Sequence, residues 1–142
     1  MIRRTAFPGP DLSGFAVTVA SVTTSTTGDR MSLEDADARA LQVRALYEQL
    51  ENRLLGRTWT LPELALGFTN DAAYVGRLVL AAERTWGIDG DVDDELRHKL
   101  AECLWWVFVL GDRLGVDVPA AYESTMDKIG GGLERAVRGA SS

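Results

Sequence analysis

Two pairs of polar side chains stand three residues apart in stretches that are otherwise apolar. Asp71 and Tyr74 form the first pair, and Lys99 and Glu102 form the second. Residues three apart lie on one face of a helix, so each pair can present both of its side chains to the same neighbour. Oxygen donors from two facing helices are a common way for a helical bundle to hold a hard cation such as Mg²⁺. Only two of these four side chains are acidic, so a cation site built from them would be incomplete.

Helical periodicity and end signals place the two pairs on the second and third of four expected helices. Gly56 supplies a left-handed stop for the first helix. Thr60 begins the second helix, with Glu63 completing a capping box and Pro62 in the first turn, where its missing N–H costs nothing. Glycines 130–132 are expected to break or fray the last helix. The expected helices cover residues 32–55, 60–86, 93–114 and a stretch around 122–137.

Each expected helix carries an apolar stripe, and no segment from residue 32 onward alternates with the period of a strand. The fold is therefore expected to be all-α, a bundle of about four helices with antiparallel neighbours. The third helix is apolar nearly all round, so its second face, with Trp105 or Trp106, is expected to meet another subunit of a homo-oligomer. The side chains expected to fill the core are Val43, Leu46, Tyr47, Leu50, Leu54, Leu64, Phe68, Ala72, Val75, Val79, Leu96, Leu100, Leu104, Val107, Leu110 or Leu114, Tyr122, Met126, Ile129, Leu133 and Val137.

Composition narrows the classes of function. The chain has 142 residues, 21 acidic and 15 basic side chains and a net charge of −6. Without a dense basic patch, nucleic acid is not an expected partner. No stretch approaches the roughly 18 apolar residues of a membrane span, and a single cysteine, Cys103, fits a cytoplasmic protein. Residues 1–31, rich in Thr and Ser, are expected to be a disordered leader before one helical domain over residues 32–142.

Residues 57–129 resemble a known enzyme family. The stretches "RTWTLPELALGFTNDAAYVGRLVLAAE" and "KLAECLWWVFVLGDRLGVDV" are similar to the MazG-like all-α nucleoside triphosphate pyrophosphohydrolases. That family carries acid-x-x-acid on one helix and Glu-x-x-Asp on the next, followed by an apolar run. The resemblance implies a Mg²⁺-dependent enzyme that converts a nucleoside triphosphate to the monophosphate and pyrophosphate, usually as a dimer or tetramer.

Carried over by position, the resemblance assigns the metal-binding and catalytic acids to Asp71 and Glu102. Tyr74 and Lys99 stand where the other two acids belong. The four positions then sum to a charge of −1 instead of −4. An ammonium about 5 Å from Mg²⁺ repels it by roughly 6–7 kcal/mol at an effective dielectric of 20. The expected enzymatic activity is therefore weak or lost.

Three hypotheses remain open from the residues. A displaced carboxylate, Glu95, could rebuild part of a metal site beside Asp71 and Glu102 in an active enzyme. Lys99, salt-bridged to Asp71 or Glu102, could instead stand in place of the metal and either lock the bundle or bind a phosphate directly. The third is a non-enzymatic nucleotide-binding or oligomeric interaction module, in which Lys99 and Arg77 meet phosphates as point charges. For a bound nucleotide, the expected contacts are Lys99, Tyr74, Arg77, Trp59 and Trp106, with the two tryptophans stacking on the base.

Overall fold

The computed structural model describes residues 30–140, and the expected leader over residues 1–31 lies almost wholly outside this range. The described residues form four α-helices and no strand: α1 (Leu33–Leu55), α2 (Leu61–Ala82), α3 (Val92–Leu114) and α4 (Val118–Gly139). All four helices belong to one unit, Met31–Ser142. The expected all-α class and number of helices are confirmed. No described helix combines the length and apolar character that crossing a membrane requires.

The helix ends follow the signals in the sequence. Gly56 ends α1 with a φ of 69°, a left-handed conformation that glycine adopts without strain. At the start of α2, the Glu63 carboxylate accepts hydrogen bonds from the backbone N–H of Thr60 at 2.7 Å and from its hydroxyl at 2.9 Å. Hydrogen bonds from Arg57, and then from Thr60, lower the pKa of Glu63 to about 2. The helix ends at Ala82, four residues before the expected end, and Arg84 follows with a φ of 57°.

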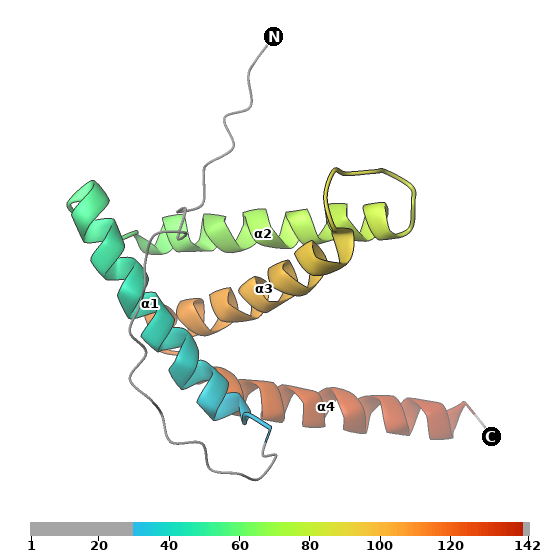
Figure 1. The fold of residues 1–142 in the computed structure, drawn as a ribbon. Helices are drawn as coiled ribbons and strands as arrows, with labels where there is room; N and C mark the ends of the chain where they lie inside the picture. Colours follow the sequence, from blue (N-terminus) through green and yellow to red (C-terminus); the bar gives the residue numbers. More distant parts are fainter. Residues whose placement is uncertain (1–29, 141–142) are drawn as a thin grey trace. The chain divides into compact units, whose positions relative to one another are not determined.

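The core lies where α2 and α3 pack against each other in antiparallel directions (Figure 1). Leu64 of α2 contacts Trp106 and Val109 of α3, and all three are buried. The close approach depends on Gly67, because a Cβ there would lie 2.6 Å from two ring carbons of Trp106. Helix α1 crosses the end of this pair and also packs against α3.

Helix α1 meets the core through a charged pair. Arg44 and Glu51 are 5% and 8% exposed, and two hydrogen bonds of 2.6 and 2.9 Å join the guanidinium to the carboxylate. Glu51 also accepts a hydrogen bond of 2.8 Å from the backbone N–H of Trp59, before α2 begins. Buried charges need such partners, because desolvation otherwise outweighs any gain. This pair therefore ties α1 to the start of α2.

The expected core was wrong for much of the chain. On α1 the buried side chains are Ala40, Arg44 and Glu51. On α2, Leu64 is buried as expected, but the second buried side chain is Leu78. On α3 the buried side chains include Trp106, Phe108 and Val109. Trp106, one of the two tryptophans expected to face another subunit, is therefore buried within the chain. The expected core residues that lie exposed are Leu46, Leu54, Ala72, Val79, Leu100, Leu104, Val107, Leu114, Tyr122, Met126, Ile129, Leu133 and Val137.

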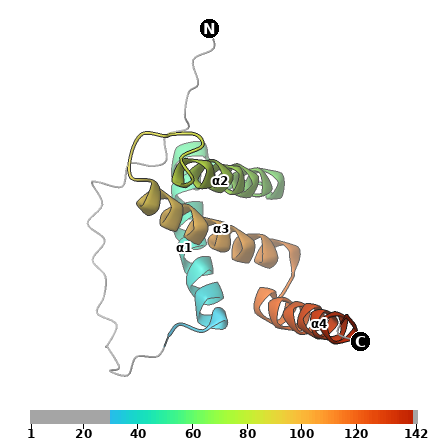
Figure 2. The same ribbon diagram turned by 90° about the vertical axis from the view of Figure 1, so that its right-hand side faces the viewer.

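Helix α4 differs most from expectation. It continues through Gly130, Gly131 and Gly132 without a break. Its first turn holds its one buried residue, Pro119, and from there α4 runs apart from α3 (Figures 1 and 2). Periodicity shows which face of a helix is apolar but does not show what covers that face.

Two glycines of α2 test the packing of this helix on α3. Gly67→Ala should lower the free energy of unfolding by about 1–3 kcal/mol, because the new methyl group forces the Trp106 ring to move. Gly76 has open space around its Cβ position. Gly76→Ala should therefore raise the free energy of unfolding by about 0.5–1 kcal/mol through helix propensity alone. Urea denaturation measures both, and equal stabilisation by the two variants would contradict the described contact.

Candidate functional site

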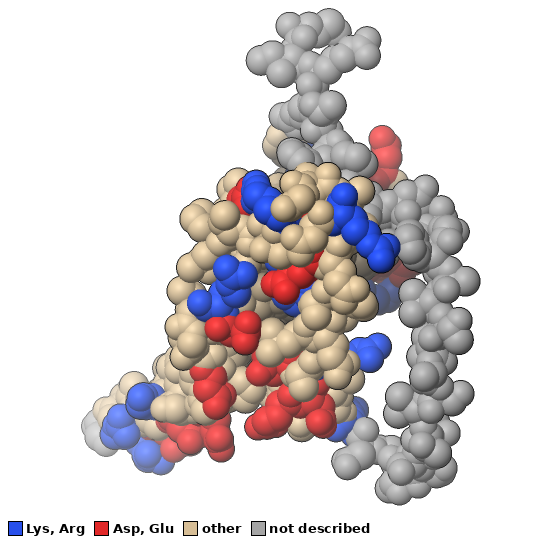
Figure 3. Space-filling model, turned by 90° about the vertical axis from the view of Figure 1, so that its left-hand side faces the viewer, with Lys and Arg blue, Asp and Glu red and all other residues tan. Residues whose placement is uncertain are grey.

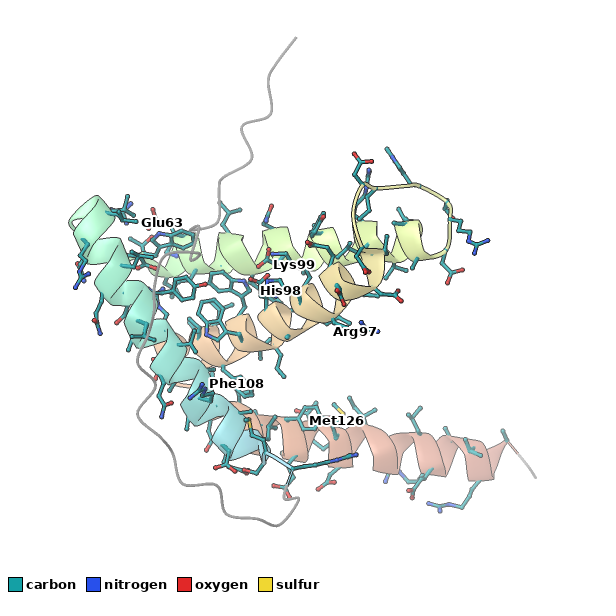
Figure 4. All side chains as sticks on the ribbon, in the orientation of Figure 1. Glu63, Arg97, His98, Lys99, Phe108 and Met126 are labelled. Carbon is teal, nitrogen blue, oxygen red and sulfur yellow. The ribbon has the colours of Figure 1, made fainter. Side chains whose placement is uncertain are left out.

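Helices α2 and α3 bring Asp71, Lys99 and Glu102 together. The Lys99 ammonium donates a hydrogen bond of 3.2 Å to Oδ1 of Asp71 and a second hydrogen bond to Oε2 of Glu102. Figure 4 shows Lys99 on the side of α3 that faces α2. A salt bridge from Lys99 to Asp71 or Glu102 is one of the three alternatives that the sequence leaves open, and the structure contains both pairs. Asp71 and Glu102 thus converge on a lysine nitrogen.

Partial burial strengthens this ion-pair cluster. The side chains of Asp71, Lys99 and Glu102 are 14%, 20% and 31% exposed. Burial alone would lower the pKa of Lys99, but hydrogen bonds to Glu102 and Asp71 outweigh it and raise the pKa above its ordinary value. Lys99 is therefore protonated at neutral pH. Its contribution to stability is complete below the ordinary lysine pKa and is lost as pH rises through the raised value.

An indole N–H holds the second oxygen of Asp71. Nε1 of Trp106 donates a hydrogen bond of 2.8 Å to Oδ2 of Asp71. The same indole stacks on Trp59 with ring centroids 6.4 Å apart. Both oxygens of Asp71 therefore have donors from α3, one charged and one neutral. Nucleobase stacking by Trp59 and Trp106 remains a prediction, and in the structure each already has the other ring as a neighbour.

Tyr47 of α1 is a neighbour of this cluster. The sequence predicted only that Tyr47 belongs to the core. Its ring packs on Trp105 with centroids 5.3 Å apart. Burial raises the pKa of Tyr47, and the negative charge of Glu102 raises it further. Trp105 in turn donates a hydrogen bond of 3.0 Å to the carbonyl of Ala40. Helical spacing within α1 could not reveal that Tyr47 approaches acids on other helices.

The other expected site residues lie around the cluster without joining it. Tyr74 is half-buried on α2, one turn beyond Asp71. The Arg77 guanidinium lies 4.2 Å from the ring centroid of Trp86, an arrangement typical of a cation–π contact. Glu95 is exposed near the start of α3. His98 is exposed and places Nε2 3.2 Å from Oε1 of Glu102.

The side chains present do not fit a resident Mg²⁺. Mg²⁺ favours carboxylate and water oxygens in near-octahedral arrangement. Here the two convergent carboxylates bind an ammonium, and Tyr74 offers a phenol where the family has an acid. Within residues 30–140, no three acidic, histidine or cysteine side chains gather in a way that could hold a metal ion. The cluster instead pairs two carboxylates with one internal cation, which leaves a net charge of −1.

No protein-family model, curated protein or solved structure matches the chain. The resemblance to MazG-like enzymes therefore depends on the motifs of α2 and α3. On the face of the molecule in Figure 3, basic side chains are interspersed with acidic ones, and acidic side chains gather along its lower edge.

The ion-pair cluster can be tested through Lys99. Lys99→Met leaves Asp71 and Glu102 close together without a cation, so the free energy of unfolding at pH 7 should fall by about 1–3 kcal/mol. A proton on either carboxylate relieves the repulsion. The loss should therefore shrink as pH falls to about 4, because the folded variant then takes up a proton more readily than the unfolded chain. Chemical denaturation at several pH values measures this.

The other lysine of the chain, Lys128, provides the control because it is exposed on α4. Lys128→Met should change the free energy of unfolding by less than about 0.5 kcal/mol at either pH. A Lys99→Met variant as stable as the wild type at pH 7 would show that the ion pairs do not hold α2 to α3.

Proposed function

We propose that the chain is a MazG-like nucleotide pyrophosphohydrolase homologue whose hydrolytic activity is weak or absent. The observation that carries this proposal is the position of the Lys99 ammonium, within hydrogen-bond distance of Asp71 and Glu102. In the family that the motifs resemble, carboxylates at these positions bind Mg²⁺. The Lys99 ammonium takes the place of Mg²⁺ as the partner of both acids.

Electrostatics supports the proposal that this site no longer binds Mg²⁺. Binding Mg²⁺ between Asp71 and Glu102 requires Lys99 to leave two carboxylates or to remain near a divalent ion of the same sign. The first option breaks partly buried ion pairs, and the second adds several kcal/mol of repulsion. Each 1.4 kcal/mol corresponds to about tenfold in affinity. Millimolar Mg²⁺ is then insufficient to load the site.

The alternative is a non-enzymatic nucleotide-binding module in which Lys99 and Arg77 contact phosphates. In the structure the ammonium of Lys99 is bound to two carboxylates, and the guanidinium of Arg77 lies over Trp86. Both cations would have to exchange partners to reach a phosphate. The contacts of these cations therefore favour a structural role for Lys99 over phosphate binding.

Pyrophosphate release tests the proposal directly. The full chain is incubated with a panel of nucleoside triphosphates, including dUTP, with Mg²⁺, with Mn²⁺ or with a chelator. The expected result is no metal-dependent release above the protein-free blank. Metal-dependent turnover that Glu102→Gln abolishes would contradict the proposal and favour an active enzyme with a reduced set of carboxylates.

Restoring the missing acids tests the geometry behind the proposal. Tyr74→Glu combined with Lys99→Glu removes the internal cation and supplies four carboxylates. We expect Mn²⁺ to bind the double variant at least about 100-fold more tightly than the wild type, as measured by titration calorimetry. The control, Ser124→Glu with Lys128→Glu, makes the same change in net charge on α4 and should not gain this affinity. Failure of the restored variant to bind while folded would show that the four positions do not converge as a metal site.

A further inference from the structure

Helix α4 carries an apolar face that the described part of the chain leaves uncovered. Tyr122, Met126, Ile129 and Leu133 follow each other at steps of four, three and four residues, so they share one face. They are 58%, 41%, 50% and 62% exposed. Figure 4 shows Met126 on the side of α4 that is turned toward α3. This apolar stripe therefore faces the space between the two helices.

A second apolar stripe, on α3, borders the same space. Leu100, Leu104 and Val107 are 53%, 48% and 37% exposed, and Gly111 continues their series at the next step of four. Helix α4 packs on α3 at Gly111, because a Cβ there would lie 2.3 Å from a methyl group of Val118. From this contact the two helices run apart (Figure 1). They form an open pair with exposed apolar side chains along both helices.

Carboxylates gather where this open pair begins. Asp37 lies on α1, Asp112 lies near the end of α3, and Asp117 is the N-cap of α4. Burial raises the pKa of Asp37, and the negative charges of Asp112 and Asp117 raise it further, so the three carboxylates are close enough to repel one another. Among the described residues, no lysine, arginine or histidine lies within salt-bridge distance of any of them. This acidic vertex therefore has no counter-charge.

We propose that the open pair binds a basic amphipathic helix of a different protein. The apolar face of that helix packs on the two stripes, and its Lys or Arg side chains pair with the acidic vertex. Binding of this kind uses apolar anchors at steps of three and four residues. The face of α4 from Val118 to Leu133 extends about 22 Å at 1.5 Å per residue, so a helix of about 15 residues matches it.

The exposed area supports a bound partner. The seven exposed side chains of the two stripes present on the order of 600 Å² to solvent, which is at the upper limit of what a monomer usually exposes. A helix with one apolar face normally buries that face against another element. The stripes therefore account for the apolar half of the proposed partner.

Charge determines the other half. The chain has a net charge of −6, and a second copy of it would bring the same uncompensated carboxylates. A basic helix instead supplies the missing counter-charge at the vertex and is attracted by the field of the whole chain. This inference uses residues outside the cluster of Asp71, Lys99 and Glu102, and it does not depend on the proposed function.

Two synthetic peptides of 16 residues test the proposal with the full chain. In both, leucines stand at helical steps of three and four. The remaining positions are mostly lysine in one peptide and glutamate in the other. Fluorescence anisotropy of the labelled peptides should show the lysine peptide binding at least about 10-fold more tightly at low salt, and added salt should reduce this preference.

Substitution of the acidic vertex tests the charge complementarity. Asp37→Asn, Asp112→Asn and Asp117→Asn together should reduce the affinity for the lysine peptide at least about 10-fold, and asparagine can still cap α4. The control removes three exposed carboxylates elsewhere through Glu83→Gln, Asp89→Asn and Asp94→Asn. It makes the same change in net charge and should stay within about threefold of the wild type. Equal losses in both variants would overturn the proposal, because attraction by net charge alone would then explain binding.

Substitution of the stripes tests the apolar contact. Leu104→Ser with Ile129→Ser should weaken binding of the lysine peptide at least about 10-fold. Leu66→Ser removes a leucine of α2 that is 68% exposed, and it should leave binding within about threefold. A stripe variant that binds as tightly as the wild type would contradict the proposed surface.

NMR of the unmodified protein provides a readout that needs no variant to fold. The lysine peptide should shift amide signals of α4 from Tyr122 to Leu133 and leave those of α2 from Leu61 to Thr69 nearly unchanged. Shifts confined to other helices would overturn the proposal. No binding of the lysine peptide at 100 micromolar would overturn it as well, as expected if a second copy or a lipid surface covers the stripes.

Discussion

The contact between α2 and α3 depends on one partly buried cluster of charge. Asp71 is the only member on α2, and it receives hydrogen bonds from Lys99 and Trp106 on α3. Removing any one of these groups would leave another polar atom with reduced solvation and no partner, which is costly inside a protein. The arrangement therefore sets the register of the two helices at the same place where apolar packing of Leu64 on Trp106 holds them together.

Under the proposed function, the same contacts show how positions that bind a metal ion in MazG-like enzymes can serve as part of a scaffold. A divalent cation stabilises neighbouring carboxylates only when it is bound, whereas a lysine is always present and has no dissociation equilibrium. An ammonium carries half the charge of Mg²⁺, which matches a site where Asp71 and Glu102 remain and Tyr74 contributes none. With two carboxylates and one ammonium, the four positions sum to a charge of −1. Under the proposal, catalytic metal binding and an internal ion pair are alternative uses of the same positions.

Local signals predicted most of the secondary structure. Gly56, and Thr60 with Glu63, each end or begin a helix where the sequence indicates, because caps depend on neighbouring residues. The three-residue spacing also placed Lys99 and Glu102 on one face of a helix, whereas the approach of Lys99 to Asp71 depends on how α2 packs against α3.

Contacts between residues on different helices were harder to predict from one sequence. The hydrogen bond from Trp106 and the approach of Tyr47 depend on rotations of whole helices, which periodicity does not specify. The apolar periodicity of α4 likewise does not show whether its own chain covers that face, and most of these residues are exposed.

The central claim, that the Lys99 ammonium takes the place of a metal ion between Asp71 and Glu102, is tested most directly by ¹⁵N NMR of the lysine ammonium groups during titration with Mg²⁺, with Lys128 as the internal reference. The account predicts a slowly exchanging Lys99 signal that is lost in Asp71→Asn and is unchanged by Mg²⁺. A Lys99 signal that exchanges as fast as that of Lys128, or that shifts as Mg²⁺ binds, would contradict the account.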